Sequence, residues 1–169
     1  MRVLVLNGPN LNLLGQREPE IYGTATLDAI LAELVLEAER LGIEVECFQS
    51  NHEGELIDRV QEARGRFDGL LVNPGGLTHY SIALLDALLS VGLPAVEVHL
   101  TNTARREPFR AVSVTSRGVM ARVEGFGGRG YLLALQGLVH LLRGTNPGIE
   151  PAGAGASRGS EDPAAGQGS

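Results

Sequence analysis

The stretch GLLVNPGGLTHYSIALLDALLSVGLPAVEVHL, residues 69–100, decides the fold class. It begins with the apolar run 69–73, passes through a glycine-containing turn into the amphipathic segment 81–92, and ends in the apolar run 94–100. Short apolar runs are typical of buried strands, and apolar residues that recur with a period of about 3.6 are typical of helices. The stretch therefore predicts two parallel strands joined by a helix.

The same alternation continues on both sides of this stretch. Further strands are expected at residues 2–7, 43–49 and 119–125, and further helices at 26–42, 53–65 and 129–142. Strands that alternate with helices indicate a parallel sheet covered on both faces. We therefore predict an α/β fold with three αβα layers, in which a five-stranded parallel sheet is doubly wound in the flavodoxin-like manner.

The chain has 169 residues, which is enough for one domain with a substantial core. Residues 1–143 are expected to form a single flavodoxin-like domain, and residues 144–169, rich in Gly, Ala, Pro and Ser, a disordered tail. No apolar run is long enough to cross a bilayer, and the N-terminus turns polar too early for a signal peptide. A soluble cytoplasmic protein with no membrane partner is the expectation.

Charge and composition exclude several classes of function. The net charge of −6 argues against a nucleic-acid partner. All fourteen basic residues are arginine, so neither a lysine Schiff base nor a P-loop lysine is available. The single cysteine, Cys47, lies in an alternating run and is expected to be a buried, inert thiol. No Cys/His spacing indicates a zinc site.

Polar residues gather where the expected strands end. Asn7 and Asn73 follow two apolar runs, and Glu97 and His99 lie near the end of a third. Ligands of open parallel sheets bind outside the carboxyl ends of the strands. Because side chains alternate along a strand, Glu97 and His99 share one side, where two buried ionisable groups need partners. A satisfied core pair is one reading, and their position favours a site.

Three loops at this edge carry further candidate residues. The long loop 7–24 contains Arg17 and Tyr22, and its residues fit a surface loop and a binding loop equally well. The loop 73–81 contains a Gly-Gly pair that lets backbone approach a ligand, followed by His79. In the segment TARREPFR, Arg105, Arg106 and Arg110 are candidates to hold an anionic substrate, and Arg105 is expected to be solvated.

Five segments together resemble the type II 3-dehydroquinate dehydratase (type II dehydroquinase) family over residues 2–142. They are LNGPNLNLLGQREPEIYG, QSNHEGELID, NPGGLTHYS, VEVHLTN and GFGGRGYLLAL, in the expected order. The resemblance implies a flavodoxin-like fold and a homo-oligomer of trimers that assemble into a dodecamer, without cofactor or metal. It also implies an enzyme of the shikimate pathway to chorismate and aromatic amino acids, which eliminates water from 3-dehydroquinate to give 3-dehydroshikimate.

The resemblance also implies catalytic roles for four residues. Tyr22 corresponds to the family's proton acceptor, and Arg17 to the residue that supports its charged form. Asn10 corresponds to an asparagine that holds a water against the substrate oxygen. His99 corresponds to the proton donor to the leaving hydroxyl group.

The resemblance also implies a set of substrate-binding residues. Asn73, beside His99, and His79 bind the substrate, and the backbone of Leu100 with the side chain of Thr101 binds its carboxylate. Arg110 binds a ring hydroxyl, and Asp86 is supplied from a neighbouring subunit. Two positions depart from the family's pattern. Thr101 stands where serine is usual, so carboxylate binding is expected to change modestly. Ala104 stands where histidine is usual, which bears on packing or subunit contacts.

The residues themselves suit this chemistry. Elimination of water β to a ketone needs a base for the adjacent C–H, a place for enolate charge and an acid for the hydroxyl. Without lysine, an iminium route is closed and a direct enolate route remains. Tyrosine ionises near pH 10, so full ionisation at pH 7 means offsetting about 3 pKa units, and an adjacent arginine typically shifts a pKa by about 1–3 units. Tyr22 beside Arg17 is therefore a reasonable base for an E1cB-like elimination.

Three other functions are known for folds of this kind or follow from the departures in the sequence. A flavin- or nucleotide-binding module would need a hydroxyl-rich phosphate loop after the first strand, but LNGPNLN has no Ser or Thr. A phosphoacceptor signalling domain would need an aspartate at the end of the third strand and a later lysine, but the chain has Asn73 and no lysine. An enzyme of the same scaffold acting on another polyhydroxylated acid stays open because of Thr101.

Overall fold

The structure is a computed structural model that describes residues 1–16 and 25–144. Within them, five strands form one parallel sheet: β1 (Arg2–Asn7), β2 (Glu44–Gln49), β3 (Gly69–Asn73), β4 (Ala95–His99) and β5 (Ala121–Glu124). Their order is β2-β1-β3-β4-β5. This is the flavodoxin-like doubly wound order, in which the chain reverses direction across the sheet between β1 and β3.

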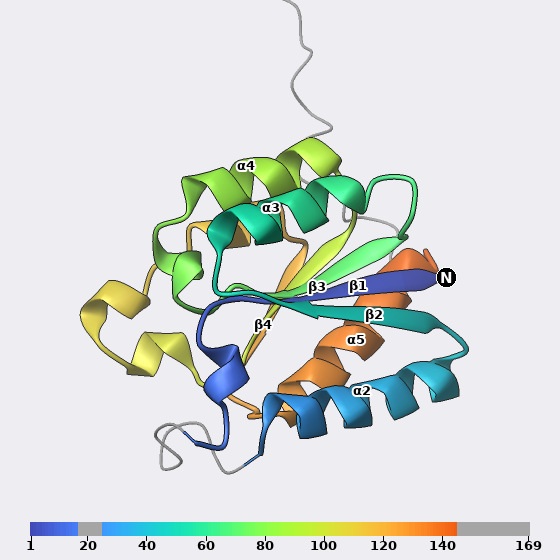
Figure 1. The fold of residues 1–169 in the computed structure, drawn as a ribbon, viewed down its shortest axis with the longest axis horizontal. Coiled ribbons are helices and arrows are strands. Elements are labelled where there is room, and N and C mark those ends of the chain that lie inside the picture. The colour runs from blue at the N-terminus through green and yellow to red at the C-terminus, as the bar shows by residue number, and fades with distance from the viewer. Residues whose placement is uncertain (17–24, 145–169) are drawn as a thin grey trace, which may run out of the picture.

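Helices cover both faces of the sheet, as Figure 1 shows. They are α2 (Leu27–Leu41), α3 (Glu53–Glu62), α4 (Ile82–Val91) and α5 (Arg129–Leu142). Helices α3 and α4 pack side by side on one face, and α2 and α5 on the other (Figure 1). The side chains of Thr26 and Ser81 cap α2 and α4 by accepting hydrogen bonds from backbone N–H groups in the first turn.

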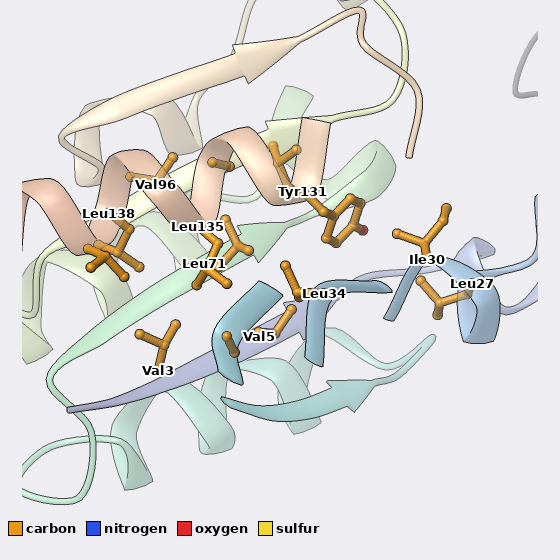
Figure 2. Packing of buried hydrophobic residues seen from close by; sticks show 14 of the residues in the cluster. Val3, Val5, Leu27, Ile30, Leu34, Leu71, Val96, Tyr131, Leu135 and Leu138 are labelled. Carbon is orange, nitrogen blue, oxygen red and sulfur yellow. The ribbon is translucent and has the colours of Figure 1, made fainter. Parts of the chain in front are cut away.

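The core divides into two halves because side chains alternate along each strand. On β1, Val3 and Val5 belong to the cluster beneath α2 and α5, whereas Leu4 and Leu6 belong to the cluster beneath α3 and α4. Figure 2 shows the first cluster, where Val3 and Val5 lie among leucines of α2 and α5. A strand buried on both faces must be apolar at successive positions, which explains the continuous apolar runs of the sequence.

The predicted fold class is confirmed, and the strands and helices begin and end within a few residues of the expected positions. The sequence pattern missed five short 3₁₀ helices: η1 (Leu11–Leu13), η2 (Gly75–His79), η3 (Thr103–Arg105), η4 (Pro108–Arg110) and η5 (Thr115–Gly118). Segments of three to five residues are too short to show a helical period. Four of the five lie in the loops after β3 and β4, so the missed structure surrounds the polar edge of the sheet.

One expectation about the sheet is wrong. Cys47 is exposed rather than buried, because β2 is an edge strand with no neighbouring strand beyond it. The strands and helices all lie within the predicted domain 1–143. Of the predicted tail 144–169, all residues after Gly144 lie outside the described residues. Across 1–16 and 25–144, no helix has both the length and the apolar character needed to cross a membrane.

Candidate active site

A cavity of about 170 Å³ opens over the carboxyl ends of β1, β3 and β4. The loops that follow these three strands supply its walls, so it lies at the reversal point of the sheet where ligands of this fold class bind. The residues that line it are Pro9, Asn10, Leu11, Leu13, Leu14, Asn73, Gly75, Gly76, His79, His99, Leu100, Thr101, Thr103, Arg106 and Arg110.

Two glycines hold the first two of these loops together. The Gly8 N–H donates to the Asn73 carbonyl oxygen over 2.8 Å. A Cβ atom at Gly8 would lie 2.4 Å from the carbonyl oxygen of Pro74, well inside contact distance. Gly75 has a φ of 58°, and a Cβ there would lie 3.0 Å from the Pro9 carbonyl oxygen. Only glycine fits at both positions, and the close approach brings the residues after β1 next to those after β3.

Asn10 adopts a rare backbone conformation at the cavity wall. Its φ of 67° lies in the left-handed region, and no other non-glycine residue of the described chain has a positive φ. The Asn10 N–H donates to the Asn51 side-chain oxygen over 2.9 Å, and Gln49 Nε2 donates to the same oxygen over 3.2 Å. Asparagine tolerates this region better than most residues, and such strain is frequent at functional sites.

Glu97 and His99 form a buried pair at the floor of the cavity. Glu97 is fully buried, His99 is 6% exposed, and His99 Nε2 lies 2.7 Å from Glu97 Oε1. The two side chains lie on one side of β4, as the alternation along the strand predicted, and they are hydrogen-bonded to one another. Because a carboxylate can only accept, Nε2 carries a proton and donates it. His99 Nδ1 makes no hydrogen bond to another described residue, which leaves this nitrogen to a ligand.

Three hydroxyl groups also bind the Glu97 carboxylate. Thr78 and Ser113 donate to Oε1 over 2.9 and 3.1 Å, and Thr115 donates to Oε2 over 2.5 Å. Burial by itself would raise the pKa of Glu97. The hydrogen bond and charge of His99 and the hydroxyls of Thr115 and Thr78 outweigh burial and hold the pKa below its usual 4.5. Glu97 is therefore an anion that fixes the tautomer and orientation of His99.

An arginine on the neighbouring strand extends this network. Arg122 Nε lies 3.2 Å from Glu97 Oε1, and its terminal nitrogen pairs with Glu124. Glu124 in turn accepts hydrogen bonds from the backbone and hydroxyl of Thr103, over 3.0 and 2.7 Å. Thr103 lines the cavity, so the charges beneath the floor also fix one of its walls.

His79 and Asn73 face the cavity from the loop after β3. His79 Nδ1 lies 2.8 Å from the carbonyl oxygen of Val112, and a carbonyl only accepts, so Nδ1 carries the proton. Its Nε2 is then free to accept a hydrogen bond from a ligand. The Asn73 side chain accepts from the Gly75 N–H over 3.1 Å and donates to the hydroxyl of Tyr131 over 2.9 Å.

Two arginines supply positive charge on the side of the cavity formed by the segment after β4. Arg106 and Arg110 both line it, and their Nε atoms lie 3.5 and 3.0 Å from the carboxylate of Glu107. Thr101 and the backbone of Leu100 lie on the same wall. Guanidinium groups, a hydroxyl and backbone at one wall suit a ligand that carries a carboxylate and hydroxyl groups.

Seven of the predicted site residues line this one cavity: Asn10, Asn73, His79, His99, Leu100, Thr101 and Arg110. Asp86 does not line it and is exposed on α4. Arg17 and Tyr22 lie outside the described residues. Ala104, where the family pattern has histidine, is exposed beside the cavity segment, and Arg105 is exposed as expected.

Sequence reasoning missed some of the residues that build the site. Thr78 lies within the segment NPGGLTHYS but was not a candidate residue, and Ser113 and Thr115 belong to no motif. Only the need of Glu97 for partners pointed to such a set. Arg106 was one of three candidate arginines, and the structure adds it to the cavity wall beside Arg110. Within residues 1–16 and 25–144, no three His, Cys, Asp or Glu side chains gather closely enough to hold a metal ion.

The fold and the site define a class of protein: a flavodoxin-like α/β domain with a His–Glu pair, amides and arginines at the reversal point of its sheet. The family model described as dehydroquinase class II matches residues 1–139. The chain therefore belongs to the class II dehydroquinase family, as its sequence motifs predicted.

Relatives and solved structures agree with this assignment. The chain is 57% identical over 143 residues to the 3-dehydroquinate dehydratase of Synechococcus sp. (strain CC9902), covering 85% of this chain and 98% of that protein. The type II dehydroquinase from Butyrivibrio crossotus DSM 2876 superposes with a TM-score of 0.80 at 46% identity, covering 82% of this chain and 97% of that one. The type II dehydroquinase from Propionibacterium acnes gives a TM-score of 0.79 at 43% identity, covering 82% and 95%.

Proposed function

We propose that this chain dehydrates 3-dehydroquinate to 3-dehydroshikimate in the shikimate pathway, in the cytoplasm and without a cofactor. One observation carries the proposal beyond family membership. A histidine held by a buried carboxylate opens into the same cavity as Asn10, Asn73 and Arg110. An acid, amide groups and a guanidinium are thereby within reach of one small polyhydroxylated acid.

The first step is removal of the C–H proton next to the substrate ketone. Tyr22, in its ionised form, takes this proton, and Arg17 stabilises the tyrosinate. The electrons of the C–H bond move into an enolate, whose oxygen is stabilised by a water held by Asn10. The described part of this loop ends at Gln16, so Arg17 and Tyr22 enter this step as a proposal from the family motif.

The second step is loss of the β-hydroxyl group. The enolate electrons form the new carbon–carbon double bond as the C–O bond breaks. His99 acts as an imidazolium, protonated at Nδ1 as well as at Nε2; it gives the Nδ1 proton to the departing hydroxyl, which leaves as water, and keeps the Nε2 proton hydrogen-bonded to Glu97. The Glu97 carboxylate supports this role, because it holds the ring through Nε2 and leaves Nδ1 to face the cavity. Asn73 binds the substrate beside His99.

The remaining residues orient the substrate. The backbone of Leu100 and the hydroxyl of Thr101 bind the carboxylate, and Arg110 and His79 bind ring hydroxyls. Thr101 lines the cavity and keeps the hydroxyl of serine, so its extra methyl group alters the fit around the carboxylate rather than removing the donor. We expect a somewhat raised KM rather than a lower kcat.

A homo-oligomer completes the site in this proposal. Asp86 lies on the exposed side of α4, and it reaches a substrate only if another copy of the chain packs there. Tyr80 and Ile82, beside the start of α4, are 66% and 64% exposed. Exposed apolar side chains so close together favour association. We propose trimers in which Asp86 serves the neighbouring site, with four trimers forming a dodecamer.

A direct assay tests the proposal. With 3-dehydroquinate, the purified protein should produce the ultraviolet absorbance of a conjugated enone, and borohydride should not inactivate it, since no iminium forms. Tyr22→Phe should abolish nearly all turnover. No enone absorbance from the wild type would reject the proposed function, and near-normal turnover by Tyr22→Phe would reject the proposed base.

A further inference from the structure

Tyr131 lies at the start of α5, completely buried in the core cluster beneath that helix (Figure 2). Its hydroxyl is not buried among apolar groups alone. It contacts the side chains of two asparagines, Asn7 at the end of β1 and Asn73 at the end of β3. These asparagines occupy paired positions on the two adjacent strands. A single hydroxyl therefore bridges the two strands at the reversal point of the sheet.

The direction of these hydrogen bonds is fixed at one end by the backbone. Asn7 Nδ2 lies 3.2 Å from the carbonyl oxygen of Phe48, which can only accept. The Asn7 side-chain oxygen must then face Tyr131, 2.7 Å away, so the hydroxyl donates its one proton to Asn7. The Tyr131 oxygen is left as an acceptor, and the group facing it from Asn73 must be the NH₂ group.

The other end of the chain of bonds independently requires the same orientation. The backbone N–H of Gly75 can only donate, and it lies 3.1 Å from Asn73 Oδ1. The Asn73 amide is thus held with its oxygen toward Gly75 and its nitrogen toward Tyr131. One N–H of Asn73 is used by Tyr131, and the other makes no hydrogen bond to another described residue. Asn73 therefore presents a donor, not an acceptor, to the cavity.

We propose that Tyr131 is a positioning residue, which orients the Asn73 carboxamide so that an N–H points at an oxygen of the bound substrate. This inference rests on the proposed function. Tyr131 itself does not touch substrate, because it is completely buried and does not line the cavity. Without its hydroxyl, the Gly75 N–H would still hold the amide oxygen, but the carboxamide would be held at that one atom only and its nitrogen could swing away from the substrate.

The test is a double-mutant cycle on kcat/KM for 3-dehydroquinate with Tyr131→Phe, Asn73→Ala and the double variant. Tyr131→Phe should lower kcat/KM about tenfold, the loss expected for one directed hydrogen bond. In the Asn73→Ala background, the same change should have almost no further effect. Leu135→Ala is the control, since Leu135 is equally buried one turn further along α5 and contacts no site residue through a hydrogen bond. It should lower stability but leave kcat/KM unchanged below its unfolding temperature.

Equal effects of Tyr131→Phe in both backgrounds would overturn the proposal, as would a tenfold loss in Leu135→Ala. Neutron diffraction of the wild type gives a test that needs neither activity nor a stable variant. It should show the Tyr131 deuteron pointing to Asn7 and the Asn73 ND₂ group facing Tyr131, and the reverse orientation would overturn the proposal. A wild type without dehydratase activity but with this orientation would reject the proposed function and leave the positioning intact.

Discussion

Replacing Glu97 with glutamine tests how the site holds its histidine. Glutamine has the same shape, but it carries no charge and offers one oxygen in place of two. The native carboxylate accepts from His99 and Thr78 at Oε1 and from Thr115 at Oε2, all in a fully buried position. In the variant, the donors on one side of the side chain meet an NH₂ group instead.

The expected loss of stability follows from that mismatch. A hydrogen bond to an ionised acceptor contributes about 1.5–3 kcal/mol, and a serine or threonine hydroxyl can turn round to accept from the new NH₂ group. Removing a buried charge also lowers the cost of burial. We expect a net loss of about 2 kcal/mol, equivalent to a Tm lowered by about 4–8 °C for a domain of this size. Because His99 loses its anionic partner, kcat/KM should fall at least about tenfold.

The pH dependence of stability gives a second, independent test of the role of the Glu97 carboxylate. Since the pKa of Glu97 lies below its usual 4.5 in the folded state, its stabilisation is present above pH 4.5 and is lost as the pH falls through the folded-state pKa. The difference in unfolding free energy between wild type and Glu97→Gln should therefore be constant near neutral pH and shrink below pH 4.5.

Urea denaturation across this pH range and enone formation at pH 7 are the measurements. Glu37→Gln is the matched control. Glu37 is also buried, on α2, and accepts a hydrogen bond from Gln136, but it does not line the cavity. It should lose stability without losing kcat/KM. The reasoning is refuted if Glu97→Gln changes the unfolding free energy by less than about 0.5 kcal/mol, the range of ordinary surface substitutions, and keeps wild-type kcat/KM.

Two further predictions concern the loops and the assembly. Gly8→Ala places a methyl group 2.4 Å from the Pro74 carbonyl oxygen, so the loops after β1 and β3 must separate. We expect urea denaturation to show an unfolding free energy lower by about 1–3 kcal/mol, together with a raised KM. An unchanged KM would contradict the role given to this contact. If Asp86 serves a neighbouring site, mixing inactive Asp86→Ala and His99→Ala chains during refolding should restore part of the activity, whereas mixtures as inactive as their parents would contradict that role.

Much of the fold could be predicted because the sheet is buried on both faces. The central strands β1 and β3 are continuous apolar runs and the helices are amphipathic, so both patterns are readable directly. The 3₁₀ helices around the cavity have too few residues to show a period. The prediction that Cys47 is buried is wrong because alternation identifies a strand but does not reveal that the strand lies at the edge of the sheet.

In the candidate site, too, some contacts could be predicted from the sequence and others could not. Glu97 and His99 could be placed on the same side of β4 from sequence, because a strand places residues two apart on one side; their hydrogen bond to each other is seen only in the structure. The contact of Tyr131 with Asn7 could not be foreseen, because the two residues are 124 positions apart and meet only when α5 packs on the sheet. The shape of the loop that begins at Gly8 depends on its close contact with the Pro74 carbonyl group of another loop, and no local sequence pattern encodes that contact.

The central claim is that the cavity over β1, β3 and β4 carries out the dehydration, with His99 as its acid. The most direct measurement is kcat/KM for 3-dehydroquinate, followed by enone absorbance, for the wild type and His99→Ala side by side. The wild type should show clear turnover, and the variant should lose at least about 100-fold, the usual contribution of a general acid. A His99→Ala protein that dehydrates 3-dehydroquinate as fast as the wild type would contradict the central claim.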